Sequence, residues 1–396
     1  MDKIGIVLCD TLPMPPVKGG AVENLLQTII DQNERQGDLE LLVYSIWDKK
    51  LNEVSLKFHN TQYIYYRPSK LQRAGDILLK VLRRISRQWF SKLTPSLYEI
   101  EAYLSLKKQG VRKVILANCP YYAPYINRKN EFHLIQYLHN DYLKEKNALT
   151  AKVFQHTQQY IGVSEFITKR VKEAVDNDIQ IDVCYNGIEI DLFSNINQSD
   201  VAALRKRLQL KEDDKVIVFV GRLTENKGVM ELLKAFGRLS KEHTNWKLVI
   251  VGGLSFSSDK VNEYVAKLKQ TADKIGNQVR MVGYVDYRLI PVYLHTAHLC
   301  VIPSTEYESF NLSSVEAQAS GLPVIVSDAG GIVETVTDKS GVIVKRDGFF
   351  VENIAKSIEL ILADDGLRER MSEAAIESAN RYPAEAMYRK FVELVK

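Results

Sequence analysis

The chain has 396 residues and a formal net charge of +4, with 45% hydrophobic and 26% charged residues. This composition is that of an ordinary globular protein, and it excludes a fibrous repeat or an extended disordered chain. A chain of this length is expected to form about two to three domains.

The first half of the chain alternates short apolar runs with longer helical patterns. The runs are residues 4–8, 41–45, 114–117, 132–138 and 159–163. This alternation predicts a parallel sheet covered by helices. A glycine pair, Gly19 and Gly20, precedes the first helical pattern. Glycines at a helix N-terminus let backbone amides approach a phosphate or a sugar, although a Gly-Gly pair is also common in ordinary turns.

A basic stretch runs from Arg67 to Leu93 and contains a single acidic residue, Asp76. Its apolar residues recur at helical spacing, which is typical of a basic amphipathic helix that can lie on an anionic membrane surface. A core-facing helix with a solvated basic back is an equally good interpretation. We do not expect nucleic acid as a partner, because no recognised binding motif accompanies the charge.

Two polar segments follow in the first half. His139 comes directly after the predicted strand 132–138, so we expect its ring to face a cleft at the strand end and to form hydrogen bonds. Asp176, Asn177 and Asp178 match a DxD pattern that could indicate a metal-bound nucleotide, but their polar surroundings predict a turn. No histidine belongs to a cluster with metal-ligand spacing, so no metal site is expected.

The alternation restarts in the second half after a polar stretch at 193–199, where we expect a linker. The second set of apolar runs is 216–220, 247–251, 279–282, 299–302, 323–327 and 342–344. The sequence therefore predicts an α/β protein with two doubly wound, Rossmann-like domains that face each other across a cleft. In such folds ligands bind at the carboxyl ends of the strands.

Two cations follow the first strand of this second set. Arg222 and Lys227 lie in the segment GRLTENKG, within one turn or loop at the strand's carboxyl end. They could clamp a diphosphate and stabilise negative charge on a leaving nucleotide. A solvated turn remains the alternative for such a pair.

Two glutamates flank a strand-to-helix junction in the segment VIPSTEYESFNLSSVE. Glu308 is expected in the loop and Glu316 inside the following helix, roughly 12 Å further on at 1.5 Å per residue. That separation is too long for a glycosidase acid/base pair. It suits two carboxylates that bind hydroxyls at different places on an extended ligand, such as the sugar and the ribose of a sugar nucleotide. Two ordinary surface glutamates are the alternative.

In this order, the segments resemble the family 4 glycosyltransferases of the two-domain GT-B class. The resemblance rests on GG at 19–20, the histidine at 139, VSEF at 163–166, YNGIEIDLF at 185–193, VGRLTENKG at 220–228, VIVGG at 249–253, VGYV at 282–285 and the segment 302–334 with its E-x7-E pattern. The chain departs from the family after Glu308. Gly-Phe-Gly is frequent there, whereas this chain has Ser309, Phe310 and Asn311.

The resemblance implies a role for each charged residue named above. Arg222 and Lys227 would bind the donor diphosphate, Glu316 the ribose hydroxyls, and Glu308 the hydroxyls of the transferred sugar. His139 would contact the donor sugar near its anomeric carbon. Family members mostly retain the anomeric configuration without an obvious protein nucleophile, so a departing phosphate oxygen would accept the proton of the acceptor.

The resemblance also implies donor-binding residues that act largely through the backbone, at Gly20, Gly283, Tyr284, Phe310, Asn311 and Leu312. The amides of residues 310–312 would hold phosphate and sugar, and the glycine at 20 would cap the donor from the other domain. The segment at 283–284 would lie near the base.

By the same resemblance, residues 1–193 would form an acceptor-binding domain and residues 194–378 a nucleotide-sugar-binding domain, both Rossmann-like. Residues 379–396 would form a helix that returns to the first domain, with Met387, Phe391 and Leu394 at helical spacing. Closure of the domains on substrate is expected.

The function implied is that of a retaining hexosyltransferase acting in capsular or other cell-surface polysaccharide synthesis. It would use a nucleotide-sugar donor, with UDP-sugars favoured, and a saccharide or lipid-linked saccharide acceptor, without a metal or other cofactor. The four well-separated cysteines favour a reducing compartment, and no apolar run is long enough for a signal peptide or a membrane span. We therefore expect a cytoplasmic protein, with the basic stretch as the feature that could place it on the inner face of the membrane.

Three other functions are compatible with parts of the pattern. One is a catalytically silent nucleotide- or carbohydrate-binding GT-B protein, which the full set of cationic and acidic positions disfavours. A second is a phosphorylase that uses pyridoxal phosphate on the same geometry. A nucleotide-dependent dehydrogenase is disfavoured, because no G-x-G-x-x-G follows the first strand.

Overall fold

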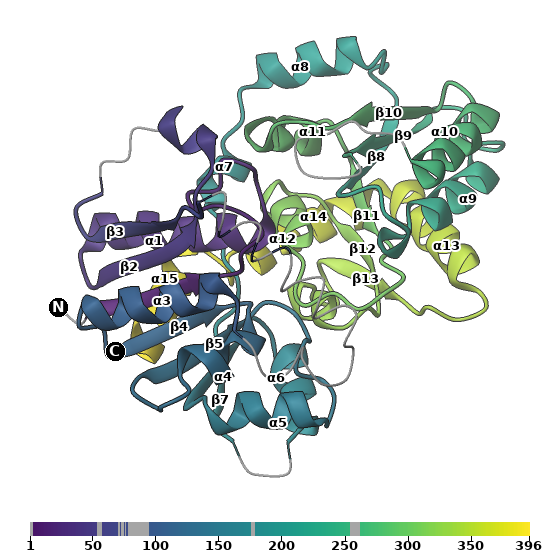
Figure 1. The fold of residues 1–396 in the computed structure, drawn as a ribbon. Coiled ribbons are helices and arrows are strands. Elements are labelled where there is room, and N and C mark those ends of the chain that lie inside the picture. The colour runs from purple at the N-terminus through teal and green to yellow at the C-terminus, as the bar shows by residue number, and fades with distance from the viewer. Residues whose placement is uncertain are drawn as a thin grey trace. The chain divides into compact units, whose positions relative to one another are not determined.

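The computed structural model describes residues 3–53, 58–69, 72, 75, 77, 95–175, 179–253 and 262–396. The chain forms two compact units, which we call unit 1 (Met1–Tyr185 with Met387–Lys396) and unit 2 (Asn186–Ala386). Each unit is built on one parallel sheet, which confirms the predicted fold class (Figure 1).

Residues 186–193, which we expected in the first domain, belong to unit 2. Ile188 pairs with Pro383 there in an isolated parallel bridge, and a Cβ at Gly187 would lie 2.7 Å from the carbonyl oxygen of Pro383. These backbone contacts tie the segment after residue 185 to unit 2.

Unit 1 contains a seven-stranded parallel sheet in the order β3-β2-β1-β4-β5-β6-β7. The strands are β1 Lys3–Leu8, β2 Glu40–Ile46, β3 Thr61–Tyr66, β4 Lys113–Ala117, β5 His133–Leu138, β6 Gln159–Gly162 and β7 Ile181–Val183. Five of them match the predicted runs, and the two edge strands β3 and β7 were not predicted.

Three described helices of unit 1 begin at residues whose side chains cap the helix. Ser96 and Glu99 form a capping box at α3, and the side chains of Asn147 and Ser164 cap α5 and α6. The helices are α1 Ala21–Gln36, α3 Leu97–Lys108, α4 Ala123–Ile126, α5 Ala148–Gln155 and α6 Glu165–Glu173, with 3-10 turns η1 Lys49–Glu53 and η2 Pro120–Tyr122.

Helix α15 (Ala384–Val395) contributes its residues from Met387 onward to unit 1. The Tyr388 hydroxyl donates to Asn33 Oδ1 at 2.8 Å, and the Phe391 ring lies 5.8 Å from that of Tyr137. Both Tyr388 and Phe391 are fully buried. The end of the helix therefore forms part of the hydrophobic core of unit 1.

Two sequence predictions concern residues that the structure does not describe. Most of the basic stretch at 67–93 lies outside the described residues, including its arginines at 83, 84 and 87. The DxD pattern at 176–178 lies outside them as well. Within the part of the chain that is described, no helix combines the length and the apolar character needed to cross a membrane.

Unit 2 contains a six-stranded parallel sheet in the order β10-β9-β8-β11-β12-β13, in which all six predicted runs are strands. They are β8 Lys215–Val220, β9 Trp246–Val251, β10 Val279–Gly283, β11 Leu299–Ile302, β12 Val324–Ser327 and β13 Gly341–Val344. The helices are α7 Ile190–Ser194, α8 Gln198–Arg207, α9 Val229–Leu239, α10 Glu263–Ile275, α11 Ile290–His295, α12 Leu312–Ala319, α13 Phe350–Ala363 and α14 Asp365–Ala379, with η3 Glu225–Lys227, η4 Tyr287–Leu289 and η5 Gly331–Thr335.

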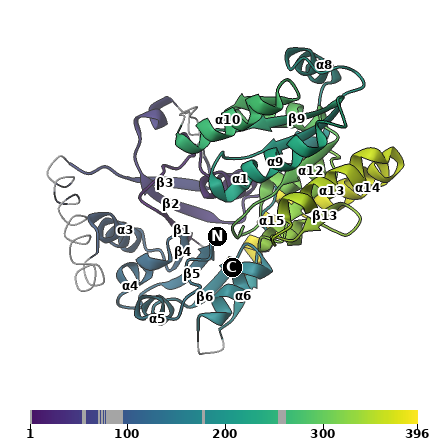
Figure 2. The ribbon, with the colours of Figure 1, turned by 90° about the vertical axis from the view of Figure 1, so that its right-hand side faces the viewer.

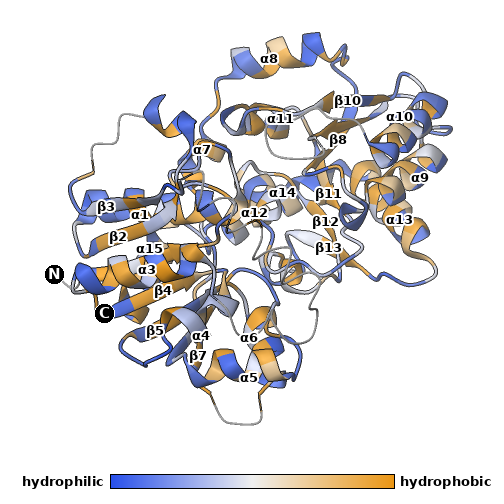
Figure 3. Ribbon diagram, viewed as in Figure 1, coloured by the Kyte–Doolittle hydropathy of each residue, from blue (hydrophilic) through white to orange (hydrophobic). Residues whose placement is uncertain are grey.

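The core of unit 2 lies between this sheet and the helices α9, α10 and α13 (Figure 2). Leu232 and Phe236 of α9 are fully buried and belong to the same hydrophobic cluster as Ile217 and Phe219 of β8 and Ile358 of α13. The strands are largely hydrophobic, whereas hydrophilic residues lie on the outer faces of the helices (Figure 3). Such strands are typical of a parallel sheet covered on both faces.

Candidate active site

A lysine and a glutamate meet at the carboxyl ends of β8 and β11. Lys227, the last residue of η3, donates from Nζ to Glu308 Oε1 at 2.6 Å. The same oxygen accepts a hydrogen bond from Ser304 Oγ at 2.6 Å. The two charged side chains are only 17% and 14% exposed. The structure thus joins the residue predicted to bind a diphosphate to the residue predicted to bind a sugar.

The backbone of Glu308 is held against the loop that follows β12. Its N–H donates to the carbonyl of Ala329 at 2.8 Å, and its carbonyl accepts from the N–H of Gly331 at 2.7 Å. The loops also approach closely at Gly228, whose φ is +68° and where a Cβ would lie 1.8 Å from the carbonyl oxygen of Pro303. Only glycine fits there, and this places the start of α9 directly against the loop that carries Glu308.

Glu316 lies inside α12 and is buried, with 5% of its surface exposed. The Tyr287 hydroxyl donates to its Oε1 at 3.0 Å. Burial raises the pKa of Glu316 to about 7, and the hydrogen bond from Tyr287 acts in the opposite direction. Glu316 is therefore not a surface glutamate, and its charge changes near neutral pH. No sequence pattern indicated Tyr287 as the partner of Glu316.

Asn311 stands where the family often has glycine, and it keeps a glycine-like backbone with φ at +111°. Its side chain caps α12 by accepting from the N–H of Ser314 at 3.1 Å. Before it, the ring of Phe310 is buried against the ring of Tyr382, with 5.1 Å between the centroids. Leu312 is the first residue of the helix. Asn311 thus differs from the family's glycine in residue type, yet it adopts a positive φ that glycine favours.

The remaining predicted donor residues of unit 2 follow the neighbouring strands. Arg222 is exposed after β8. Gly283 ends β10 with φ at +87°, and the side chain of Tyr284 is partly exposed after it. Tyr284 lines a pocket of about 640 Å³ along the edge strand β10.

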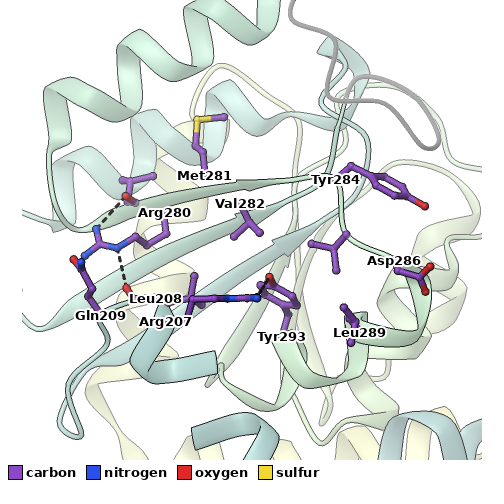
Figure 4. Close-up of a pocket in the computed structure, with 12 residues that line it drawn as sticks. Arg207, Leu208, Gln209, Arg280, Met281, Val282, Tyr284, Asp286, Leu289 and Tyr293 are labelled. Atoms are coloured by element: carbon purple, nitrogen blue, oxygen red, sulfur yellow. Dashed lines mark hydrogen bonds between the residues drawn. The ribbon is translucent and has the colours of Figure 1, made fainter. Parts of the chain in front are cut away.

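Other residues that line this pocket, among them Arg207, Arg280 and Tyr293, were not predicted as site residues (Figure 4). Arg280 donates from Nε to the carbonyl of Leu208 at 2.9 Å, and Arg207 donates from Nη2 to the hydroxyl of Tyr293 at 2.5 Å. Arg280 therefore holds the residue that follows α8, and Arg207 links the end of α8 to α11.

In unit 1, His139 follows β5 and is buried, with 6% of its surface exposed. Its ring lies 4.3 Å from the ring of Tyr137, and neither ring nitrogen has a hydrogen-bond partner among the described residues. Its backbone N–H donates to Asn118 Oδ1 at 3.2 Å. Burial lowers the pKa of His139 to about 3, so its imidazole is neutral at neutral pH. The ring packs against a buried tyrosine. That it also faces a cleft and forms hydrogen bonds there stays a prediction.

Gly20 also belongs to unit 1 and immediately precedes α1, with φ at +123°. A Cβ at this position would lie 2.0 Å from Oε2 of Glu23. Glu23 itself is buried, and desolvation raises its pKa. The glycine is therefore required for the close approach of this carboxyl group, which the sequence analysis did not anticipate.

Known proteins resemble this chain in both sequence and fold. Residues 200–378 match the family described as Glycosyl transferases group 1. YtcC of Bacillus subtilis (strain 168) is 26% identical, with 94% of this chain and 86% of YtcC covered. The lipopolysaccharide 1,2-N-acetylglucosaminetransferase of Salmonella typhimurium (strain LT2) is 27% identical, with 80% and 81% covered. The crystal structure of Anabaena Alr3699/HepE in complex with UDP-glucose has a TM-score of 0.76 at 20% identity, with 99% of each chain covered.

The two parallel-sheet units and these structural neighbours define the GT-B fold of glycosyltransferases. Residues 200–378 are similar to the glycosyl transferases group 1, which confirms the resemblance to the family 4 glycosyltransferases.

Proposed function

We propose that the protein is a retaining glycosyltransferase that moves a hexose-type sugar from a UDP-sugar to a saccharide acceptor. The observation that carries the proposal is the Lys227–Glu308 pair at the carboxyl ends of two strands of unit 2. A cation beside a carboxylate provides one group for a phosphate and one for sugar hydroxyls. The family match over residues 200–378 supports glycosyl transfer as the reaction.

In this proposal each charged residue binds one part of the donor. The ammonium group of Lys227 has three hydrogens, so it can keep its bond to Glu308 and also donate to a diphosphate oxygen. Arg222 supplies a second cation for the diphosphate. Glu308 accepts hydrogen bonds from the sugar hydroxyls, and Glu316 accepts them from the ribose. These assignments follow from the resemblance. The Lys227–Glu308 ion pair is consistent with the roles proposed for Lys227 and Glu308.

The transfer step requires stabilisation of the leaving group. The bond between the anomeric carbon and the phosphate oxygen breaks, and a bond from the acceptor oxygen forms on the same face. The acceptor's proton passes to the departing phosphate oxygen, while Lys227 and Arg222 stabilise the charge that develops there. Glu308 already accepts hydrogen bonds from Lys227 and Ser304, which suits a binding role better than nucleophilic attack. We propose that no metal is needed, because Lys227 and Arg222 supply the positive charge at the leaving group.

The substrates are proposed from the relatives. One neighbour of known structure, Alr3699/HepE, was solved with UDP-glucose, which supports a UDP-sugar donor. The Salmonella relative is a lipopolysaccharide glycosyltransferase, which supports a saccharide acceptor in a capsule or other cell-surface polysaccharide. We further propose that this acceptor is lipid-linked, and that the basic stretch at 67–93 holds the enzyme on the inner face of the membrane.

A donor panel tests the proposal. Binding of UDP-, GDP- and dTDP-sugars to the purified protein is measured by calorimetry, and slow sugar release is followed in parallel. One nucleotide class is expected to bind, with release that Lys227→Ala and Glu308→Ala abolish while circular dichroism stays unchanged. Lys234→Ala, at an exposed lysine of α9, is the matched control and should keep full activity. Binding without release in the wild type would instead indicate a catalytically silent protein.

A further inference from the structure

Arg346 joins three loops at the carboxyl edge of the sheet in unit 2. It stands two residues after β13 and donates from Nε to Asp328 Oδ1 at 2.8 Å and from Nη2 to the carbonyl of Asp328 at 3.1 Å. Its third nitrogen, Nη1, donates to the carbonyl of Thr305 at 2.9 Å. The guanidinium group thus links the end of β13 to the loops that follow β12 and β11.

Thr305 extends this network to the turn that carries Lys227. The N–H of Thr305 donates to the carbonyl of Asn226 at 3.0 Å, and its hydroxyl donates to the carbonyl of Glu225 at 3.1 Å. Asn226 and Glu225 immediately precede Lys227 in η3. One residue, Thr305, is therefore bonded to Arg346 through its carbonyl and to the lysine turn through its N–H and hydroxyl.

The same three loops fix Glu308. Thr305 lies three residues before it on the loop after β11, and Asp328 immediately precedes Ala329, whose carbonyl accepts from the N–H of Glu308. Every loop that Arg346 bonds therefore holds either the backbone of Glu308 or the turn of Lys227. The Nζ–Oε1 distance of 2.6 Å depends on the relative position of these loops.

The contacts of Arg346 contribute more to the position of the loops than to the stability of the fold. Arg346 is 21% exposed and Asp328 is 43% exposed, and such partly exposed ion pairs typically stabilise a fold by about 1 kcal/mol or less. The planar guanidinium, however, donates in fixed directions to several acceptors at once, which a lysine cannot do. Its other contact is the ring of Tyr307, 4.8 Å from Cζ, directly before Glu308 in the sequence.

We propose that Arg346 is a positioning residue that sets the geometry of the Lys227–Glu308 pair. The consequence for catalysis rests on the function proposed above, whereas the consequence for the loops does not. Without the guanidinium, the peptide at 305 loses its restraint from β13, and the loop that carries Glu308 can shift relative to η3. A misplacement of about 1 Å at a reacting site can reduce a rate roughly a hundredfold.

Hydrogen exchange tests the loop positions without any substrate. In Arg346→Ala, the amides of Thr305, Glu308 and Gly331, which are bonded between loops, are expected to exchange at least tenfold faster. The amide of Cys300 in β11, bonded to the carbonyl of Pro323, should be unchanged. Arg238→Ala is the matched control, because it removes a different arginine–carboxylate pair of unit 2, with Glu352. Unchanged exchange at the three loop amides would overturn the proposal.

Kinetics with the donor identified by the panel test the consequence for the site. Arg346→Ala is expected to raise the donor KM or lower kcat by about ten- to a hundredfold. Arg346→Lys should fail to restore activity, because lysine retains the charge but lacks the planar guanidinium that donates to several acceptors at once. Wild-type kinetics in Arg346→Ala would overturn the positioning role. If the wild type itself turns over no nucleotide-sugar, the proposed function fails, while the exchange experiment still decides the role of Arg346.

Discussion

Replacing Glu316 by glutamine should stabilise unit 2 in a pH-dependent way. Burial raises the pKa of Glu316 from its ordinary 4.5 to about 7 in the folded protein. Between these values the folded state binds more protons than the unfolded state, so the stability of the wild type falls as pH rises through this window. Glutamine has no proton to lose and can still accept the hydrogen bond from Tyr287, so the variant should not show this loss.

The expected magnitude follows from the two pKa values. Their difference corresponds to about 3 kcal/mol once the pH exceeds both of them. At pH 5.5 about 1 kcal/mol of this penalty is already present, so the advantage of Glu316→Gln should grow by about 2 kcal/mol between pH 5.5 and 8.5. The change in this advantage between the two pH values isolates the effect of the pKa, because other effects of the substitution are similar at both pH values.

Urea unfolding at several pH values measures the difference. Trp246 is buried in unit 2, so a background with Trp47→Phe and Trp89→Phe makes its fluorescence report that unit. Glu377→Gln, at an exposed glutamate of α14, is the control and should show no pH dependence in this range. An advantage of Glu316→Gln that is the same at pH 5.5 and 8.5 would refute the raised pKa.

Two further predictions concern the same loop and helix. Asn311→Gly removes the strain of a positive φ, worth about 1–3 kcal/mol, at the cost of a few tenths of a kcal/mol for the lost cap, so it should be about 1 kcal/mol more stable to urea. Asn311→Ala keeps the strain and loses the cap, so it should be less stable than the wild type, and equal stability of the two variants would contradict the strain. Tyr287→Phe removes a hydrogen bond that lowers the pKa of Glu316, so the acidic limb of the pH profile of donor kcat/KM should move to higher pH; an unmoved limb would show that Glu316 does not control it.

Strands in which apolar residues predominate could be predicted from the sequence. All six strands of unit 2 and five strands of unit 1 contain such apolar runs. The edge strand β3 was missed because TQYIYY is mostly aromatic and polar, with half-exposed residues in its middle. The other edge strand, β7, has only three residues, too few to show a period.

The candidate site could be predicted one residue at a time but not as an arrangement. Lys227 and Glu308 were each found because they follow strands, yet their ion pair joins residues that are 81 positions apart. Nothing near Arg346 in the sequence indicates that it bonds a peptide 41 residues away. For His139, the end of a strand predicts where the backbone lies, but the direction of the ring depends on packing against Tyr137.

The late contribution of α15 to unit 1 has a consequence for synthesis of the chain. Besides the contacts of Tyr388 and Phe391, Gln159 donates to the carbonyl of Leu394 at 2.8 Å, and Lys113 donates to that of Val395 at 3.1 Å. The first 185 residues emerge from the ribosome long before these partners exist. Unit 1 therefore has an uncovered apolar surface until unit 2 has been translated. Domains generally fold as units in the order of their synthesis, so this chain differs from the usual order. The earlier unit is thus the later one to complete its core, and nascent chains that stop before residue 387 should depend most on chaperones.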